Sequence, residues 1–253
     1  MSALAVLLGH GIGYYASPAI HNAAFAALEL DARYEIRDVP ADALAAEIDA
    51  LRSSDRIGAN VTKPHKVAVC RLVDELGPEV RGLGAANTII RYGDRLVARN
   101  TDYPALRAEL PPEVRRAVVL GGGGASRAAV AALKAAGCEA VVVVDRSRWA
   151  NMPGAVMTAD LLVNATPIGT DSDESPVPAG LLRPEMAVLD LVYRPSPTRL
   201  VREARAAGGR ARGGAGVLLR QAVFSFSLWT DHPAPVDVMR DAVRAELGPG
   251  ADV

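Results

Sequence analysis

A glycine-rich turn between a strand and a helix is the feature that most constrains how this chain folds. The apolar run 116–120 predicts a buried strand, and the run 126–136, rich in strong helix formers, predicts a helix. Four consecutive glycines beginning at Gly121 separate them, and a second apolar strand ends at Asp145. Strand, glycine turn, helix, strand and acid follow one another in the order of a dinucleotide-binding unit. We therefore expect a Rossmann-type domain.

Positions in this turn have separate physical tasks. Gly121 permits the tight turn, and Gly123 lets the backbone approach a pyrophosphate, which binds at a helix N-terminus. Asp145 stands at about the 20-residue spacing of an acid that binds the ribose. The third glycine position of the pattern holds Ser126 instead. Because a glycine run alone is most often a loop, the flanking strands and helix carry this prediction.

Composition excludes several other classes of protein. The 253 residues suffice for one large or two modest domains. The balance of 28 basic and 29 acidic residues argues against a nucleic-acid or membrane-surface protein. Cys70 and Cys138 lie far apart and predict neither a disulfide framework nor a metal site. The first residues lack the basic flank of a signal peptide, and no apolar run is long enough to span a bilayer, so we expect a cytoplasmic protein.

The residues before the glycine turn predict a second α/β domain. Strands are expected over 5–9, 34–39 and 57–62, a hairpin around Gly93, and helices from an N-cap at Ser17, over 40–51 and over 66–76. After Asp145 the chain reaches the next strand in about 15 residues, too few for a full helix plus strand. The nucleotide domain is thus expected to be trimmed near its adenosine end. Further strands are expected over 160–167 and 186–193, and helices over 198–208, 214–230 and 236–247.

Polar residues in the first half stand where its strands end. They are Asn60, Thr62, Lys66, Asn87, Thr101 and Asp102. Each alone is typical of a cap or a turn. Together, at the carboxyl ends of strands where α/β sheets bind ligands, they predict a polyol pocket. A lysine beside a carboxylate can relay a proton to or from a carbonyl or hydroxyl group.

Short segments along nearly the whole chain form one pattern. They cover residues 17–22, 60–66, 84–88, 100–102, 121–127, 164–167, 190–193 and 214–218. In order and spacing they resemble the shikimate dehydrogenase family. The resemblance implies an NAD(P)-dependent oxidoreductase that interconverts shikimate and 3-dehydroshikimate by hydride transfer, as in aromatic amino acid biosynthesis.

The resemblance also implies domains and residue roles. We expect a substrate-binding and catalytic domain over 1–103, a dinucleotide-binding domain over 104–212, and helices over 213–253 that pack back on the first. Lys66 is implied as the acid/base residue, with Asp102 as its partner. The implied substrate-binding residues are Tyr15, Ser17, Asn60, Thr62, Asn87, Tyr193 and Gln221. The implied cofactor-binding residues are Gly121, Gly123, Gly124, Ala125, Asp145, Arg146, Thr166, Val192 and Gly214. No metal site is expected, the partner is a small-molecule substrate, and the state is a monomer or homodimer.

The chain departs from the family pattern at the substrate end. Tyr15 stands where the family has the first of two serines that touch the substrate carboxylate, and Ser17 is the second. Tyr103 replaces a small residue and Lys63 an apolar one. A quinate- or aminoshikimate-type dehydrogenase is therefore an alternative, as is a catalytically silent nucleotide-binding homologue. Lys66 and Asp102 argue against the silent homologue, since a mere binder has no need of that pair.

The choice between NAD and NADP rests on the end of the second strand. The carboxylate of Asp145 accepts hydrogen bonds from ribose hydroxyls and repels a 2′-phosphate, which favours NAD. Arg146 and Arg148 act in the opposite sense because guanidinium groups suit phosphate, although Arg146 can instead stack on adenine. We expect a slight preference for NAD.

Overall fold

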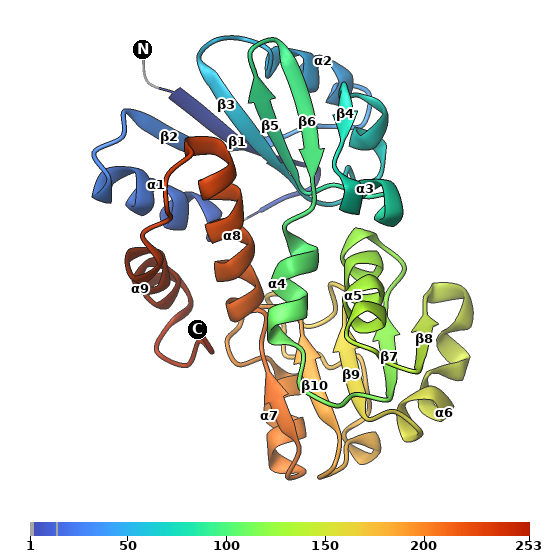
Figure 1. Ribbon diagram of the computed structural model, residues 1–253. Helices are drawn as coiled ribbons and strands as arrows, with labels where there is room; N and C mark the ends of the chain where they lie inside the picture. The colour runs from blue at the N-terminus through green and yellow to red at the C-terminus, as the bar shows by residue number, and fades with distance from the viewer. Residues whose placement is uncertain (1–2, 14) are drawn as a thin grey trace. The chain divides into compact units, whose positions relative to one another are not determined.

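The computed structural model describes residues 3–13 and 15–253 and divides into two compact units (Figure 1). Unit 1 comprises residues 1–102 and 219–246, and unit 2 comprises 103–218 and 247–253. Each unit contains a β-sheet with helices, which confirms the expected α/β fold with two domains. None of the helices in the described ranges has the length and apolar character needed to cross a membrane.

The sheet of unit 1 is mixed, with the strand order β2-β1-β3-β5-β6-β4. Its strands are β1 (Ala3–Gly9), β2 (Ala32–Asp38), β3 (Arg56–Val61), β4 (Glu75–Leu76), β5 (Thr88–Tyr92) and β6 (Arg95–Arg99). Strand β1 pairs in parallel with β2 and β3, whereas β5 runs antiparallel to β3 and β6. The expected hairpin is confirmed, because β5 and β6 flank Gly93, whose φ of 64° suits glycine.

The helices of unit 1 are α1 (Ser17–Ala27), α2 (Leu44–Ala50), η1 (Ala68–Arg71), α3 (Pro78–Leu83) and α9 (Val236–Leu247), with most of α8 (Ala215–Thr230). The expectation that Ser17 is the N-cap of its helix is wrong. Ala16 occupies the cap position without a side-chain hydrogen bond, and Pro18 lies in the first turn.

The expected helix over 66–76 is also wrong. Only the short turn η1 forms, and the chain then becomes strand β4. The reason lies at Asp74, whose backbone N–H donates to the Leu96 carbonyl at 3.0 Å and whose carboxylate accepts from the Leu96 N–H at 2.6 Å. These two bonds draw the segment alongside β6 instead of letting it close helical hydrogen bonds.

The sheet of unit 2 is parallel, with the strand order β11-β10-β9-β7-β8. Its strands are β7 (Arg116–Leu120), β8 (Ala140–Val144), β9 (Leu161–Asn164), β10 (Ala187–Asp190) and β11 (Arg210–Arg212). Strand β8 is the edge strand of this sheet. Only the short helices η2 (Arg146–Asn151) and α6 (Met152–Met157) connect it to β9. This confirms the trimmed nucleotide domain.

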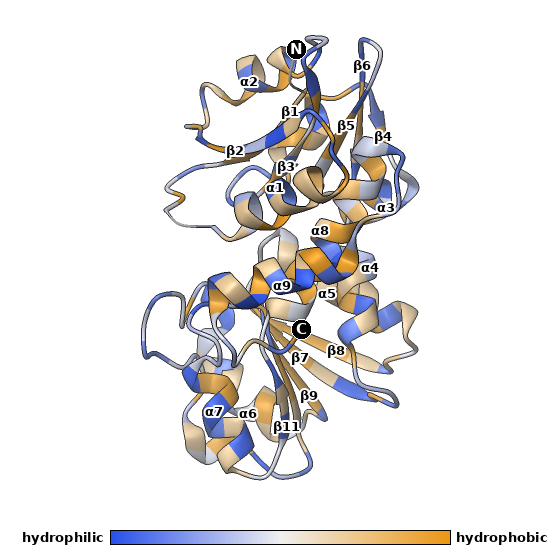
Figure 2. Cartoon of the chain, turned by 90° about the vertical axis from the view of Figure 1, so that its left-hand side faces the viewer, coloured by the Kyte–Doolittle hydropathy of each residue, from blue (hydrophilic) through white to orange (hydrophobic). Residues whose placement is uncertain are grey.

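Alternating side chains of the unit 2 strands enter two separate cores. Val118 and Leu162 pack on one face with residues of α6 and α7 (Arg199–Ala206), while Val119 and Val163 pack on the other with α4 (Asp102–Glu109) and α5 (Gly124–Ala135). Figure 2 shows these strands coloured mainly as hydrophobic. A parallel sheet covered on both faces requires this apolar character, and it presents its polar loops at the strand ends.

Candidate active site

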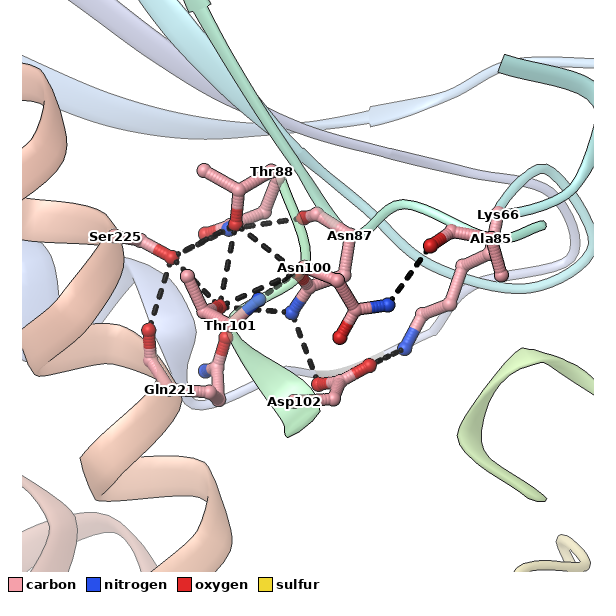
Figure 3. A network of polar contacts seen from close by, with 10 residues as sticks. Lys66, Ala85, Asn87, Thr88, Asn100, Thr101, Asp102, Gln221 and Ser225 are labelled. Carbon is pink, nitrogen blue, oxygen red and sulfur yellow. Dashed lines mark hydrogen bonds and ion pairs between the residues drawn. The ribbon is translucent and has the colours of Figure 1, made fainter. Parts of the chain in front are cut away.

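The centre of the unit 1 site is an ion pair between Lys66 and Asp102. Lys66 Nζ lies 2.7 Å from Asp102 Oδ2, and the two side chains are 18% and 13% exposed (Figure 3). Lys66 follows β3, whereas Asp102 is the first residue of α4. The pair is therefore largely shielded from solvent yet still reachable by a small molecule, which suits proton transfer.

Two buried contacts hold the Lys66 loop in place. The Lys66 carbonyl accepts a hydrogen bond of 2.8 Å from the Ala86 N–H. The neighbouring His65 is 2% exposed, and its Nε2 donates to the Val39 carbonyl at 2.7 Å. Hydrogen bonds thereby join the loop to two other segments of unit 1, and these bonds restrict the position of the Lys66 backbone.

The amide of Asn87 is oriented toward Asp102. The Thr101 N–H donates to Asn87 Oδ1 at 2.7 Å, which leaves the amide nitrogen to face the carboxylate. Asn87 Nδ2 accordingly donates to Asp102 Oδ1 at 2.9 Å. Both oxygens of Asp102 thus have a partner, Asn87 on one and Lys66 on the other.

Behind this pair lies a buried network built around Asn60, which is 5% exposed. The Tyr34 hydroxyl donates to Asn60 Oδ1 at 2.9 Å, which sets the orientation of that amide. Asn60 Nδ2 then donates to the Thr88 and Ser225 hydroxyls at 3.1 and 3.0 Å. Ser225 in turn donates to the Gln221 carbonyl of α8 at 2.9 Å.

Sequence reasoning missed Tyr34, Thr88 and Ser225. Tyr34 fell in an alternating strand pattern, and Ser225 in a predicted apolar helix. Neither pattern marks a hydrogen-bonding role, because the contacts join segments as far apart as β3 and α8. The two serines of this largely apolar helix, Ser225 and Ser227, were the available signal, since a buried hydroxyl requires a partner.

An aromatic layer supports Tyr34. His21 stacks on Tyr34 with ring centroids 4.5 Å apart, and the ring centroid of Trp229 lies 5.2 Å from that of His21. Burial lowers the pKa of His21 to about 3, so the imidazole is neutral at physiological pH. The Trp229 indole donates to the Ile89 carbonyl at 2.9 Å, directly over Gly58, where a Cβ would lie 2.4 Å from Trp229 Nε1.

The other predicted substrate residues occupy several elements. Ser17 is buried at the start of α1, half-buried Tyr15 precedes that helix, and Thr62 follows β3. Half-buried Gln221 belongs to the part of α8 in unit 1, whereas Tyr193 follows β10 in unit 2. The hydrogen-bonded network of unit 1 therefore brings together five predicted residues and the backbone of Gln221. The five are Asn60, Lys66, Asn87, Thr101 and Asp102.

The glycine turn of unit 2 has the geometry expected of a phosphate-binding loop. Gly121 has a φ of 113°, and a Cβ there would lie 2.8 Å from the Ala165 carbonyl oxygen. Gly123 is the N-cap of α5, and a Cβ there would meet nothing within 4 Å. No other part of the described chain therefore occupies the space beside Gly123, and Gly124 and Ala125 form the first turn of the helix. These residues fit a pyrophosphate bound by backbone N–H groups.

Asp145 lies beside this turn, because a Cβ on Gly122 would come within 3.3 Å of the Asp145 Cβ. Its Oδ1 accepts from the Ser147 hydroxyl at 2.6 Å and from the N–H groups of Ser147 and Arg148. The hydroxyl bond from Ser147 is the main cause of the lowered pKa of Asp145. Asp145 is thus an N-cap of η2 as well as a candidate ribose ligand, and exposed Arg146 follows it.

The segments after β9, β10 and β11 carry the remaining predicted cofactor residues. Thr166 follows β9, and its hydroxyl donates to Asn164 Oδ1 at 2.6 Å. Buried Val192 follows β10, and its carbonyl accepts from the Gly214 N–H at 3.1 Å. A Cβ on Gly214 would lie 2.4 Å from the Leu191 carbonyl oxygen, so this close approach requires glycine.

Asp190 at the end of β10 is fully buried, and burial raises its pKa from 3.8 to about 6. Hydrogen bonds from Thr198, Val192 and Asn164 act in the opposite sense but are outweighed. Because the folded-state pKa exceeds the unfolded value, stability falls as pH rises from about 4 to 6. The ionised carboxylate costs the folded state about 3 kcal/mol at neutral pH.

We therefore expect Asp190→Asn to raise the free energy of unfolding above pH 6 by up to about 3 kcal/mol. The advantage should vanish below about pH 4, where the wild-type carboxyl is protonated in both states. Urea denaturation of both proteins across this range measures the difference. A stability gap that does not change with pH would contradict the buried titration.

Within the described ranges, no three histidine, cysteine, aspartate or glutamate side chains gather as a metal site would require.

Comparison with known proteins identifies the family to which the chain is similar. Residues 7–89 match the family model of the shikimate dehydrogenase substrate binding domain, and residues 214–244 match that of the shikimate 5′-dehydrogenase C-terminal domain. Shikimate dehydrogenase (NADP(+)) of Symbiobacterium thermophilum is 38% identical, over 95% of this chain and 93% of that protein.

The chain belongs to the shikimate dehydrogenase family. The family resemblance and the assignment to an NAD(P)-dependent alcohol oxidoreductase are thereby confirmed. Among solved structures, shikimate 5-dehydrogenase from Thermus thermophilus, in complex with NADP(H) and shikimate, superposes with a TM-score of 0.86. It is 36% identical, and the match covers 96% of this chain and 99% of the other.

Another solved structure similar to this shikimate dehydrogenase family member holds a different cofactor. Quinate dehydrogenase from Corynebacterium glutamicum, in complex with NAD, has a TM-score of 0.82 and 28% identity over 96% of this chain and 99% of the other. The relative from Symbiobacterium thermophilum is named for NADP(+). The expected slight preference for NAD therefore finds no support in these names, although both dinucleotides occur among the similar proteins.

Proposed function

We propose that this enzyme interconverts shikimate and 3-dehydroshikimate with a nicotinamide dinucleotide. The observation that carries the proposal is the Lys66–Asp102 ion pair, 2.7 Å long and backed by Asn87. The names of relatives 38% and 37% identical over nearly the whole chain support the substrate. A shikimate-bound structure of 36% identity supports it as well.

In this proposal Lys66 handles the proton. During ketone reduction its ammonium group donates a proton to the substrate oxygen, and during alcohol oxidation its amine takes that proton back. Asp102 Oδ2 holds Nζ in position, while Asn87 fixes the other carboxylate oxygen. A bound nicotinamide accepts or supplies the hydride. Asn60, Thr62, Gln221 and Tyr193 are proposed to bind the substrate, with Ser17 and Tyr15 at its carboxylate.

The glycine turn, Thr166, Val192 and Gly214 are proposed to hold the dinucleotide, and NADP is the proposed cofactor. The names of the relatives support NADP. The exposed Arg146 and Arg148 at the adenosine end offer guanidinium groups suited to a phosphate. Asp145 acts against NADP by charge, so its carboxylate should limit rather than abolish NADP use.

Asp145→Asn is expected to raise the ratio of kcat/KM for NADP to that for NAD by about tenfold, because one repulsive charge is removed. Asparagine caps helices as well as aspartate does, so the hydrogen bonds to Ser147 and Arg148 should persist. Initial-rate kinetics with both dinucleotides measure the ratio. Asp173→Asn, at an exposed aspartate of the same unit, is the control, and an equal ratio in all three proteins would refute the role of Asp145.

Tyr15→Ser is expected to lower KM for shikimate by about threefold or more, because a phenol takes far more room at the carboxylate end than a hydroxymethyl group. Tyr92→Ser is the matched control, since Tyr92 is 57% exposed in the same unit. Steady-state kinetics on shikimate provide the comparison. An unchanged or higher KM in Tyr15→Ser would show that Tyr15 is no obstacle.

The substrate itself is tested by comparing kcat/KM for shikimate, quinate and aminoshikimate with NADP and NAD. The proposal predicts the highest value for shikimate with NADP. A higher value for quinate or aminoshikimate would transfer the assignment to that alternative, and the absence of turnover with all three would favour a silent homologue. Light scattering on the same preparation tests the prediction of a monomer or homodimer.

A further inference from the structure

One buried carboxylate of unit 2, that of Asp190, bonds to three segments at the ends of β9 and β10. Its Oδ1 accepts from Asn164 Nδ2 at 2.8 Å and from the Val192 N–H at 3.0 Å. Its Oδ2 accepts from the Thr198 hydroxyl at 2.7 Å. All three partners are uncharged, and Asp190 is 0% exposed. In its ionised form the carboxylate accepts all three hydrogen bonds and donates none.

Through Asn164, this carboxylate determines the course of the loop after β9. The hydrogen bond to Asp190 directs the amide nitrogen of Asn164 toward the carboxylate, so the amide oxygen faces the opposite way. Asn164 Oδ1 is then available to accept from the N–H and the hydroxyl of Thr166, at 3.0 and 2.6 Å. The Thr166 hydroxyl in turn accepts from the Ile168 N–H at 3.2 Å. If the amide turned over, an NH2 group would face the Thr166 N–H, and the loop would lose these bonds.

Through Val192 and Thr198, the same carboxylate holds the loop after β10. Thr198 is the N-cap of α7 and accepts from the Val201 N–H at 3.3 Å. Val192 is fixed at its N–H by Asp190 and at its carbonyl by the Gly214 N–H. The loop between β10 and α7 is thus pinned at both ends, and the start of α8 is joined to it.

We propose that Asp190 is a positioning residue for cofactor binding, which sets the loops after β9 and β10 by accepting three hydrogen bonds. This inference rests on the proposed function, because it takes Thr166 and Val192 to be residues that hold the dinucleotide. Ligands of open α/β sheets bind at the carboxyl ends of the strands, where both loops lie. Asp190 does not itself touch the cofactor, since its side chain is enclosed.

The test is the dissociation constant of NADPH, measured by fluorescence without turnover, for Asp190→Ala and Asp190→Asn. The alanine variant leaves three buried donors without their acceptor, and we expect its affinity to fall at least about tenfold. The asparagine variant retains Oδ1 for Asn164 and Val192, and its NH2 can donate to Thr198. Its affinity should stay within about threefold of wild type.

Asp160→Ala is the matched control. Asp160 precedes β9 at the opposite, amino-terminal edge of the same sheet, and its Oδ2 accepts from the N–H groups of Arg115 and Arg116 at 3.2 and 2.8 Å. Loss of these bonds should lower the urea midpoint without changing NADPH affinity. If Asp190→Ala does not fold, Asn164→Ala removes the same relay, and its NADPH affinity should fall likewise.

Three results would overturn the inference. The first is wild-type affinity in Asp190→Ala, or in Asn164→Ala where that variant replaces it. The second is a loss in Asp190→Asn as large as that in Asp190→Ala, because the charge and not the hydrogen bonds would then be responsible. The third is an equal loss in Asp160→Ala, which would indicate general destabilisation. Wild-type protein that binds neither NADPH nor NADH would contradict the proposed function itself and remove this inference with it.

Discussion

Lys66→Ala is expected to lower kcat by about 10²–10⁴, the usual cost of removing a positioned acid/base group. The physical reason is that Nζ, 2.7 Å from Asp102, is the proton donor and acceptor for the substrate oxygen in the proposed reaction. The dissociation constant of NADPH should not change, because Lys66 belongs to unit 1 and the glycine turn to unit 2. Steady-state rates and a fluorescence titration measure the two quantities separately.

Lys134→Ala is the control for this substitution. Lys134 is an exposed lysine in the last turn of α5, so its loss changes the charge by the same amount without touching the Asp102 network. Its kcat should stay near that of wild type. Near-normal turnover in Lys66→Ala, or an equal loss in Lys134→Ala, would remove Lys66 from the mechanism.

Two alanine substitutions in the glycine turn should have different consequences. Gly123→Ala is expected to weaken NADPH binding by about 100-fold with little loss of stability, because a Cβ there meets no protein atom but occupies the space proposed for the pyrophosphate. Gly121→Ala should lower both affinity and stability. Its Cβ would lie 2.8 Å from the Ala165 carbonyl oxygen, and its φ of 113° strains any residue with a side chain.

A fluorescence titration and a urea denaturation curve on each variant distinguish these effects. Gly180→Ala serves as the control, because its Cβ would also meet nothing within 4 Å and it lies in η3 (Ala179–Leu181), outside the turn. Full NADPH affinity in Gly123→Ala would mean that the backbone at this position does not approach the dinucleotide.

Much of the secondary structure could be predicted, because strands, helices and glycine turns leave a pattern in residues that are adjacent in the sequence. The apolar strands and glycine turn of unit 2 could be read directly, and α9 (Val236–Leu247) has the predicted bounds. The predicted helix over 66–76 is wrong because a long-range pairing, Asp74 with Leu96, overrides the helix propensity of this segment. Such a contact leaves no periodic trace in the sequence.

The candidate site shows the same division. Lys66 and Asp102 could be identified because each belongs to a segment of the family pattern, over 60–66 and 100–102. Tyr34 and Ser225 could not, because they support Asn60 from elements distant in sequence. The burial of Asp190 was likewise hidden, since an aspartate at the end of a predicted strand is more often a turn or cap residue.

The proposed oxidation of shikimate is tested most directly by mixing the purified protein with shikimate and NADP and following the absorbance of the reduced nicotinamide. We expect NADPH and 3-dehydroshikimate to form in equal amounts, and we expect the addition of 3-dehydroshikimate with NADPH to reverse the reaction. No NADPH formation from shikimate, under conditions where the folded protein binds NADPH, would contradict the proposed activity.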